Sequence, residues 1–571
     1  MNALHKIKYI RPLGSFALSI GLALGTSCSS TVAPSTSPAS SNPATGASFD
    51  AVCAAVAKRA LAGGRIVSAE FVAQGSVQSF EGSVAVPGHC KVQAKLNERT
   101  GVDGKPYAIG MELRLPKNWN GRFLFQGGGG TDGRLMPALG AQTVGSSPTA
   151  LTQGYAVAST DAGHLDEPGR TGGFQFGVDP QARIDYGYNH LPVVRNASLA
   201  LIEGFYRSRP THSYFAGCSN GGRQGMMASQ RFPEFFDGIV VGAPANRVTD
   251  ASLDAMAHTQ YLAAVAPKGS DGRPQLGAAL TPADLKTLAD GILKRCDSLD
   301  GVVDGMVSHP AQCRFNPSTV QCAAGVTANC LTANKVDAIR KVYEGAKDSA
   351  GNPLYTSWPY DPGINSPLWT MWKMGPPTST PPQAANTTLV AGALSHVFST
   401  PPVLTDDLYG FMLNTKVESL RDGFQRIQPP FRESGAHTVN AVSADIGAFT
   451  QRGGKLLFFH GMSDGIFSPQ DTINYVEQLR RKYGNKTDDF ARLFLIPGMG
   501  HCGGGPATDQ FDALDAVVQW VEKGVAPAQL NAKGSARSNF PGRTRPLCTY
   551  PQQATYNGSG DIEAAASFSC K

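Results

Sequence analysis

The sequence predicts an α/β fold built on a mostly parallel sheet, and three observations support this prediction. The segment Tyr214-Phe-Ala-Gly-Cys-Ser-Asn-Gly-Gly has the pattern of a strand, a tight turn and the start of a helix. Two later apolar runs, Lys455-Leu-Leu-Phe-Phe-His and Leu493-Phe-Leu-Ile, each end in a polar loop, and Arg122-Phe-Leu-Phe-Gln runs into four glycines. Functional loops at the carboxyl ends of strands are typical of parallel sheets, because ligands gather at that edge.

Length and composition favour one large globular body that carries an insertion. The chain has 571 residues, of which 41% are hydrophobic and 16% charged, so it can bury a sizeable core. Such a length corresponds to roughly three units of ~150 residues, or to one large domain with an insertion. The motif positions favour the second arrangement, with a core formed by residues 47–245 and 445–571 and a lid domain of residues 246–444 between them.

The charge and glycine patterns give no indication of a nucleic-acid partner or of a phosphate-binding loop. The net charge is +6, from 50 basic and 44 acidic residues without a long basic run, which does not indicate a nucleic-acid partner. The four glycines are not followed by the lysine of a phosphate-binding loop, and no pattern indicates an organic cofactor. We therefore expect a small molecule as substrate, and we expect the protein to be a monomer.

The N-terminus has the pattern of an export signal. Lys6, Lys8 and Arg11 precede an apolar run over residues 13–25, and small residues follow. The apolar run is too short to serve as a permanent membrane anchor. We expect residues 1–28 to be a signal peptide and the protein to be exported to the periplasm, to the outer membrane or out of the cell.

The segment after the signal is expected to be a disordered tether. Residues 29–46 are almost wholly Ser, Thr, Pro, Ala and Gly, which cannot bury enough apolar area to offset the entropy of the chain. If Cys28 is the first mature residue, it could carry a lipid, as in bacterial lipoproteins. Simple cleavage is the alternative, and any contact with a membrane would depend on that lipid.

Export to an oxidising compartment favours disulfide bonds among the cysteines. The chain has eleven, and setting Cys28 aside leaves ten, an even number. The sequence does not fix their connectivity. Proximity along the chain suggests four local pairs and leaves a fifth, which gives Cys53/Cys90, Cys296/Cys313, Cys322/Cys330, Cys548/Cys570 and Cys218/Cys502.

Ser219 is the candidate nucleophile, at the centre of the G-x-S-x-G pattern in its strand–turn–helix context. A serine hydroxyl needs a general base, and the base needs an orienting carboxylate. In the α/β-hydrolase fold these follow the serine in the order acid, then histidine, which selects Asp464 and His501. The alternatives are a turn-forming Asp464 and a structural loop histidine. His460 is a rival base, but it precedes Asp464 at a strand end, and so we expect it to line the substrate pocket or to pack.

Two cysteines flank the candidate nucleophile and base. Cys218 immediately precedes Ser219, and Cys502 immediately follows His501. A disulfide between them would hold the two catalytic groups within reach of each other. The alternative is a pair of buried thiols that never meet.

The glycine run supplies candidate donors for the oxyanion of an acyl-transfer reaction. Glycine-rich loops of this kind hold the oxyanion in lipases and esterases, together with the backbone N–H of the residue after the nucleophile. The candidates are the N–H groups of Gly130 and Asn220. The run could instead be a plain flexible loop.

Three of these motifs together resemble the tannase and feruloyl esterase family. They are Gly217-Cys-Ser-Asn-Gly-Gly-Arg, His460-Gly-Met-Ser-Asp and Pro497-Gly-Met-Gly-His-Cys, and the likeness extends over essentially the whole chain after the tether. The resemblance implies an α/β-hydrolase fold with a large inserted lid domain, the same triad, a Cys218–Cys502 bond and a small aromatic ester as substrate.

The resemblance also implies a structural calcium ion in the lid. From the residues alone, Cys296-Asp-Ser-Leu-Asp-Gly-Val-Val-Asp-Gly-Met could form two Asp-Gly turns, although oxygen ligands crowded on a short loop suit Ca²⁺. In the family pattern the carboxylates of Asp297, Asp300 and Asp304 and the carbonyls of Val302 and Met306 bind the ion.

For the substrate pocket, the resemblance implies that Trp372 and Phe467 enclose an aromatic acyl group; their alternative is ordinary lid core. Some members use a lid arginine to bind a carboxylate on the substrate. The matching position here falls on Ala385, and residues 374–415 contain no Lys or Arg. Because a guanidinium is hard to replace in carboxylate recognition, we expect a preference for uncharged esters over the terephthalate monoester.

The sequence as a whole predicts an exported serine esterase that hydrolyses esters of aromatic acids of the feruloyl, galloyl or terephthaloyl type. An acyl-enzyme on Ser219 would be the intermediate. The alternatives are an acyltransferase or a peptidase that uses the same triad, and a catalytically inactive binding protein.

Overall fold

The computed structural model describes residues 48–79, 82–141, 148–166 and 173–571. The predicted signal peptide, the tether and Cys28 lie outside these ranges. Among the described residues, no helix is both long enough and apolar enough to cross a membrane.

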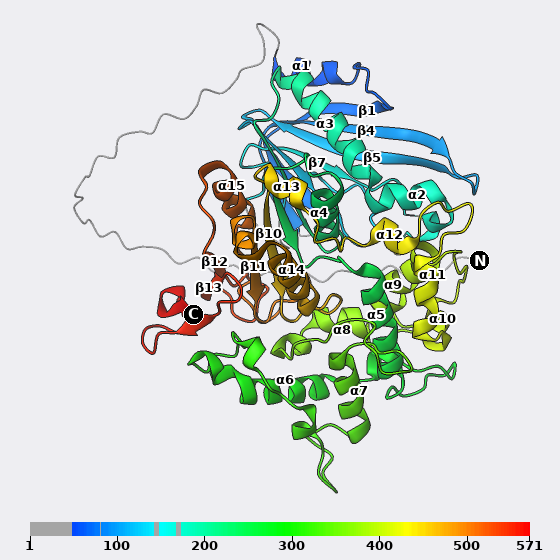
Figure 1. Cartoon of the computed structure of the whole chain (residues 1–571), viewed down its shortest axis with the longest axis vertical. Coiled ribbons are helices and arrows are strands. Elements are labelled where there is room, and N and C mark those ends of the chain that lie inside the picture. The colour runs from blue at the N-terminus through cyan, green and yellow to red at the C-terminus, as the bar shows by residue number, and fades with distance from the viewer. Residues whose placement is uncertain (1–47, 80–81, 142–147, 167–172) are drawn as a thin grey trace, which may run out of the picture. The chain divides into compact units, whose positions relative to one another are not determined.

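A nine-stranded sheet forms the centre of the described structure (Figure 1). Six strands from β7 to β11 are parallel, and β5, β4 and β1 extend one edge in antiparallel fashion. Across the sheet the order is β1 (Gly64–Val72), β4 (His89–Thr100), β5 (Pro106–Pro116), β7 (Ala156–Thr160), β6 (Arg122–Gln126), β8 (His212–Cys218), β9 (Gly238–Gly242), β10 (Lys455–Gly461) and β11 (Ala491–Ile496).

Side chains that alternate along the strands form a core on each face of the sheet. Phe123 and Phe125 of β6 belong to one core and Leu124 to the other, as the period of two requires. These three residues of β6 point to opposite faces and are all apolar, which is typical of strands covered on both faces. The first core includes side chains of α1 (Phe49–Val56), α3 (His190–Tyr206), α4 (Asn220–Arg231) and α14 (Pro469–Tyr483), and the second those of α15 (Ala513–Lys523).

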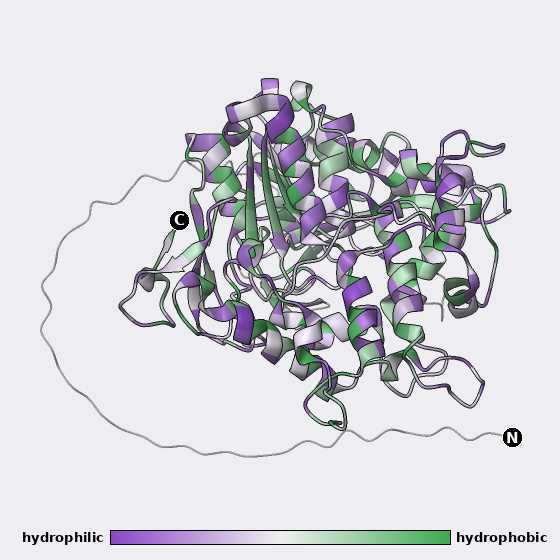
Figure 2. Ribbon diagram, turned by 60° about the horizontal axis from the view of Figure 1, so that its bottom comes forward, coloured by the Kyte–Doolittle hydropathy of each residue, from purple (hydrophilic) through white to green (hydrophobic). Residues whose placement is uncertain are grey.

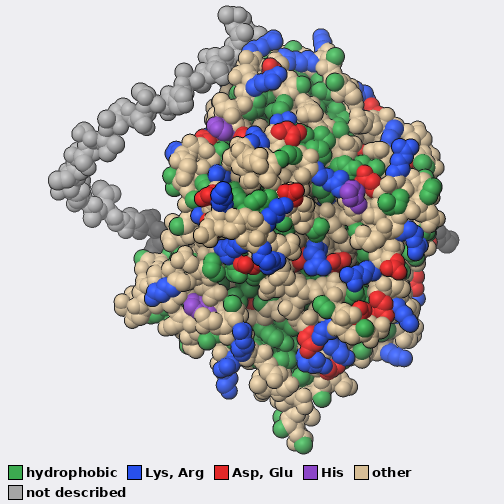
Figure 3. Space-filling view, in the orientation of Figure 1, with side chains coloured by type: hydrophobic (Ala, Val, Ile, Leu, Met, Phe, Trp, Pro, Cys, Tyr) green, Lys and Arg blue, Asp and Glu red, His purple; other side chains and the backbone are tan. Residues whose placement is uncertain are grey.

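Helix α15 exposes a polar face and buries an apolar face. In α15 the apolar residues Leu514, Val517 and Val518 recur at helical spacing and pack in the second core. Figure 2 shows the same pattern as alternating purple and green along the helices, with green strands between them. On the face shown in Figure 3, basic and acidic side chains are interspersed.

Residues 243–454 form one continuous insertion between β9 and β10, which are neighbours in the sheet. We call residues 246–444 the lid segment, as in the prediction. Its helices are α5 (Val248–Ala263), α6 (Pro282–Cys296), α7 (Ala333–Glu344), α8 (Pro367–Lys373), α9 (Leu389–Gly392), α10 (Leu408–Asn414), α11 (Arg421–Gln425) and α12 (Gly435–Val439).

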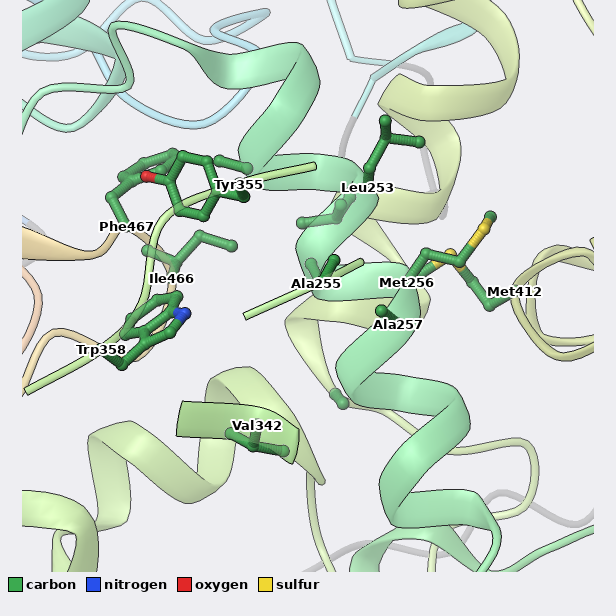
Figure 4. Close-up of a cluster of buried hydrophobic side chains, with 14 of the residues drawn as sticks. Leu253, Ala255, Met256, Ala257, Val342, Tyr355, Trp358, Met412, Ile466 and Phe467 are labelled. Atoms are coloured by element: carbon green, nitrogen blue, oxygen red, sulfur yellow. The ribbon is translucent and has the colours of Figure 1, made fainter. Parts of the chain in front are cut away.

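The lid segment has its own hydrophobic core, which continues into a loop of the sheet. Helix α5 supplies Leu253 and Met256, and α7 supplies Val342 (Figure 4). Ile466 and Phe467, which follow β10, belong to the same cluster. The lid core is therefore continuous with the loop that carries Asp464.

The remaining elements are short. They include α2 (Pro180–Ile184), α13 (Gly447–Gln451) and three two-stranded antiparallel pairs: β2 (Gly75–Ser79) with β3 (Gly82–Val86), β12 (Gln529–Lys533) with β13 (Thr544–Cys548), and β14 (Ala554–Tyr556) with β15 (Phe568–Cys570).

The ten cysteines of the described residues form the five suggested disulfides. The pairs are Cys53–Cys90, Cys218–Cys502, Cys296–Cys313, Cys322–Cys330 and Cys548–Cys570. Because disulfides persist in oxidising compartments, this number favours a location outside the cytoplasm.

Candidate active site

Ser219 occupies a sharp turn between β8 and α4. Its backbone is in an unusual region for a residue with a side chain, at φ 64° and ψ −125°. The turn is possible because its neighbours are glycines: a Cβ on Gly217 would come within 2.6 Å of Gly221, and one on Gly221 within 2.7 Å of the Gly128 carbonyl oxygen. The Ser219 N–H donates to the Gly242 carbonyl across the sheet edge at 3.0 Å. The strand–turn–helix predicted for the serine is thus present.

Asp464 and His501 form a hydrogen-bonded pair at the carboxyl ends of β10 and β11. His501 Nδ1 lies 2.7 Å from Asp464 Oδ2. The other carboxylate oxygen accepts the backbone N–H groups of Ile466 at 2.8 Å and Phe467 at 3.0 Å. Nε2 of His501, the atom that would act as base, is buried and has no hydrogen-bond partner among the described residues.

The environment of Asp464 favours its ionised form. Burial alone would raise its pKa, but the charges and hydrogen bonds of His501 and His460 outweigh burial and hold the pKa well below its usual range. An ionised carboxylate at this position accepts a hydrogen bond from the Nδ1–H of His501 and leaves Nε2 available as an acceptor.

The Cys218–Cys502 disulfide ties the serine turn to the histidine loop. The two Cα atoms lie 6.0 Å apart, although the cysteines are separated by 284 positions in sequence. Because each cysteine is the chain neighbour of a triad residue, the bond holds Ser219 and His501 at one place on the sheet edge.

The glycine loop after β6 packs directly against the serine turn. The Gly127 N–H donates to the Ala216 carbonyl at 2.9 Å, and a Cβ on Gly127 would come within 2.8 Å of Gly221 Cα. Gly130 follows at φ 59°. Only residues without side chains permit this approach, so the glycine run has a structural reason here and is not a plain flexible loop.

A buried polar cluster supports the oxyanion candidates. Asp132 accepts hydrogen bonds from the side-chain amides of Asn220 and of Gln224, while Arg223 Nε donates to Asn220 Oδ1 at 2.7 Å. Burial raises the pKa of Asp132 to about 7. Asn220 is the first residue of α4, so its backbone N–H is one of those left free at a helix N-terminus.

A cleft in front of Ser219 is lined mainly by apolar groups. Gly130, Asn220, Trp372 and Phe467 contribute to it, and so do Thr131, Tyr186, Ala245, Val248, Ser252, Leu389, Val390, Ala393, Phe398 and Ile466. None of the described residues in this lining is charged. A larger cavity of about 350 Å³, lined by Lys95, Arg99 and His164 among others, contains none of the triad residues and is therefore not the site of the chemistry.

The two predicted aromatic walls both contact the catalytic histidine. The ring of Trp372, on α8, stands edge-on to His501 with centroids 5.3 Å apart, and Phe467 does so at 5.5 Å. Ala385 lies in a short turn before α9, which supplies Leu389 and Val390 to the cleft.

His460 does not line the cleft. Its side chain has 0% exposure and lies behind Asp464, with Nε2 3.2 Å from Asp464 Oδ2. Of the two expectations for this residue, packing is the one that the structure matches.

The lid segment contributes residues that sequence reasoning missed. Asp361, which is buried, accepts a hydrogen bond from the Ser463 hydroxyl and another from the Gly498 N–H at 3.1 Å. One lid carboxylate thus bridges the loops of Asp464 and His501. In the sequence, Asp361-Pro-Gly has the pattern of an ordinary turn, and nothing in that pattern predicts the hydrogen bonds to Ser463 and Gly498.

The predicted calcium ligands lie on one turn after α6. Asp297, Asp300 and Asp304 are 5%, 1% and 8% exposed. Burial and the neighbouring acids raise the pKa of Asp297, and that of Asp300 to about 6. Asp304 pairs with Arg545, and within the described ranges no three His, Cys, Asp or Glu side chains converge as a metal-ligand set.

Comparisons with known proteins agree with this arrangement. The family model described as tannase and feruloyl esterase matches residues 90–571. The chain is 40% identical to mono(2-hydroxyethyl) terephthalate hydrolase of Piscinibacter sakaiensis, over 86% of this chain and 85% of that one. It is 31% identical to a probable feruloyl esterase of Arthroderma benhamiae, over 84% and 85%.

Solved structures show the same fold. Feruloyl esterase B from Aspergillus oryzae superposes with a TM-score of 0.75 at 24% identity, and covers 92% of this chain and 100% of that one. Tannin acyl hydrolase from Aspergillus niger gives 0.69 at 22% identity, over 92% and 96%.

Proposed function

The chain belongs to the tannase and feruloyl esterase family and is a hydrolase of aromatic carboxylic esters, and from this premise we propose that it acts through an acyl-enzyme on Ser219. The observation that carries the proposal is the Asp464–His501 pair, with its unpartnered Nε2, joined to the serine turn by the Cys218–Cys502 bond.

In the first half of the reaction, Ser219 Oγ attacks the ester carbonyl while His501 Nε2 takes its proton. The carbonyl oxygen becomes an oxyanion, which the N–H groups of Gly130 and Asn220 stabilise. When the tetrahedral intermediate collapses, the bond to the alcohol breaks, and His501 returns the proton to the departing oxygen.

In the second half, water replaces the alcohol. His501 takes a proton from the water as it attacks the acyl-enzyme. The resulting intermediate collapses and releases the aromatic acid, while His501 returns the proton to Ser219 Oγ. Asp464 remains ionised throughout and holds the imidazole with its proton on Nδ1.

The cleft supports an uncharged aromatic acyl group. Trp372 and Phe467 offer ring surfaces beside the catalytic histidine, and the described lining has no cation for a distal carboxylate. Feruloyl or galloyl esters, whose acyl groups are uncharged, are therefore proposed to be preferred to a terephthalate monoester.

A structural calcium ion is a separate proposal. Three buried carboxylates lie on one short segment together with Val302 and Met306, whose carbonyls complete the proposed ligand set, and such hard oxygen donors are those that Ca²⁺ prefers. Burial raises the pKa values of Asp297 and Asp300, with a smaller contribution from the neighbouring acids, and a bound cation would favour their ionised forms. The ion would stabilise the lid, and no catalytic step depends on it.

We also propose that the N-terminal segment directs export and that Cys28 is the site of cleavage or lipid attachment. The proposal rests on the basic and apolar pattern of residues 1–28 and on the five disulfides, which need an oxidising compartment.

The nucleophile assignment is tested with Ser219→Ala. Loss of a triad member lowers the rate by a factor of about 10⁴ to 10⁶, so hydrolysis of a 4-nitrophenyl ester should fall to near background while the melting temperature is kept. Ser213→Ala, on the same strand, is the matched control and should keep its activity. Wild-type rates in Ser219→Ala would contradict the mechanism.

A further inference from the structure

Asp464 has a second histidine partner besides His501. His460, at the end of β10, places Nε2 3.2 Å from Asp464 Oδ2, and the same oxygen lies 2.7 Å from His501 Nδ1. One carboxylate oxygen thus lies between two imidazole rings. The His460 side chain is fully buried, so it cannot reach a substrate.

The surroundings of His460 determine where its proton lies. Nε2 faces two acceptors, Asp464 Oδ2 and the Phe467 carbonyl oxygen at 3.1 Å. Since neither can donate, Nε2 must carry the proton and share it between them. Nδ1 is then an acceptor in the neutral ring, and it lies 2.8 Å from Thr472 Oγ1. The Thr472 hydroxyl is therefore the donor at Nδ1, and it anchors the side of the ring that faces away from Asp464.

Each oxygen of the Asp464 carboxylate consequently has two donors. Oδ1 accepts hydrogen bonds from two backbone N–H groups of its own loop. Oδ2 faces the Nδ1–H of His501 and the Nε2–H of His460. A donor on the buried side of Oδ2 opposes rotation of the carboxylate away from His501. His460 does not make His501 more basic, because both histidines hydrogen-bond to the same carboxylate oxygen. The contribution of His460 is to orient the Asp464 carboxylate.

His460 also fixes the loop that forms one wall of the cleft. The carbonyl that shares its proton belongs to Phe467, whose ring contacts His501. The same N–H therefore holds the triad carboxylate and the backbone of a cleft residue in one arrangement.

We propose that His460, anchored at Nδ1 by Thr472, is a positioning residue that holds Asp464 and the Phe467 backbone for catalysis. The proposal rests on the triad mechanism proposed above. It assigns no proton transfer to His460 and adds a residue on α14, Thr472, that contacts neither the triad nor the cleft.

Thr472→Val is the sharpest test, because it replaces a buried hydroxyl by a methyl group of similar shape and leaves His460 in place. Without the donor, Nδ1 becomes a buried acceptor with no partner, and the ring loses the contact that holds its Nε2–H towards Asp464 and the Phe467 carbonyl. In metal sites, removing a partner that orients a ligating side chain costs about 10- to 100-fold in affinity or activity, and we take this range as a guide. We expect kcat for a 4-nitrophenyl ester to fall by about tenfold or more, with KM changed less than kcat.

Matched variants separate this effect from damage to the fold. Thr472→Ser keeps a donor and should keep kcat. Thr259→Val, at another buried threonine whose hydroxyl donates to the Ala255 carbonyl at 2.9 Å, should lower only the melting temperature. His460→Gln can place an amide N–H near the position of Nε2, whereas the shorter His460→Asn cannot, so the first should retain more activity. If Thr472→Val does not fold, the Gln and Asn pair decides, and equal kcat for those two variants would overturn the proposal.

Labelling with a fluorophosphonate tests the nucleophile assignment and the positioning role separately. The labelled residue, found by peptide mass spectrometry, tests the nucleophile, and the labelling rate tests its activation. Label on Ser219 with a slower rate in Thr472→Val supports both. Label on Ser219 at the wild-type rate rejects the positioning role alone, and label elsewhere rejects the serine mechanism on which it rests.

Discussion

At the residue scale, Asp161 shows how an acid beside the catalytic edge affects stability. It follows β7 with 3% exposure, and it accepts the N–H groups of Gly110 at 2.8 Å and Gly163 at 2.9 Å. Burial raises its pKa from 3.8 to about 6 in spite of these bonds. The folded state therefore binds the proton more tightly than the unfolded chain does.

The sign of the pH dependence follows from that shift. The stabilisation by the protonated form is complete below pH 3.8 and is lost as the pH rises through about 6, a difference of about 3 kcal/mol. Asp161→Asn keeps an acceptor oxygen without the charge. Denaturant titrations should show wild type losing stability relative to Asp161→Asn between pH 4 and 7, and a constant difference over that range would contradict the raised pKa.

The triad and Lys373 illustrate which residues the sequence could predict and which it could not. Ser219, Asp464 and His501 were predictable because triad chemistry requires those residue types at strand ends, and the structure places all three at one edge. Lys373 was not: it is buried, donates to His258 Nδ1 at 2.7 Å and stands 4.1 Å over the Trp358 ring. These partners come from distant parts of the lid segment, and no local pattern indicates their contact.

At the scale of elements, the Cys218–Cys502 disulfide joins the turn after β8 to the loop after β11. Its loss should affect both stability and catalysis, since it removes a cross-link over a long stretch of chain and releases the spacing of Ser219 and His501. Removing a native disulfide costs about 2–5 kcal/mol. For the double variant Cys218→Ser/Cys502→Ser we expect a lower melting temperature and a kcat reduced by about tenfold or more.

The matched control is Cys322→Ser/Cys330→Ser, which opens a partly exposed loop in the lid segment over a separation of 8 residues. It should lower the melting temperature with kcat unchanged. If both double variants lose kcat to the same extent, the Cys218–Cys502 bond has no special role at the active site.

The helices of the lid segment were less predictable than the strands. Strands β8, β10 and β11 are apolar runs with clear ends, so their positions follow from the sequence. Helix α8 is only Pro367–Lys373, and its two tryptophans differ in role: Trp369 is buried in the lid core, while Trp372 reaches His501. That difference depends on tertiary packing, which local sequence does not encode.

At the scale of the whole molecule, the proposed calcium ion should stabilise the fold without taking part in the reaction. A ligand that binds only the folded state at a concentration of 100 Kd adds about 2.7 kcal/mol. Thorough chelation with EGTA should lower the melting temperature by on the order of 5 °C and leave the room-temperature rate nearly unchanged. Asp300→Asn should remove this response. An unchanged melting curve, with no calcium found by elemental analysis, would reject the site.

The choice of substrate also depends on the whole molecule, because the sheet and its loops supply Ser219 and about half of the cleft lining, and the lid segment supplies the rest. The described lining has no cation, so wild type should hydrolyse neutral aromatic esters, such as methyl ferulate, with a higher kcat/KM than a terephthalate monoester. The relative that is 40% identical is named for the monoester, which makes this a discriminating comparison.

Ala385→Arg tests whether an added cation shifts the substrate preference towards the terephthalate monoester. Ala385 is partly exposed just before α9, whereas its neighbour Asn386 is fully buried, so only the first position can accept a guanidinium without loss of packing. A charge-assisted pair contributes about 1.5–3 kcal/mol, which corresponds to a shift of about ten- to a hundredfold towards the monoester. Ala385→Gln, of similar length without the charge, should leave the preference unchanged. If wild type already prefers the monoester to its neutral methyl ester, a cation outside the described lining must bind that carboxylate, and the proposed preference for uncharged acyl groups is wrong.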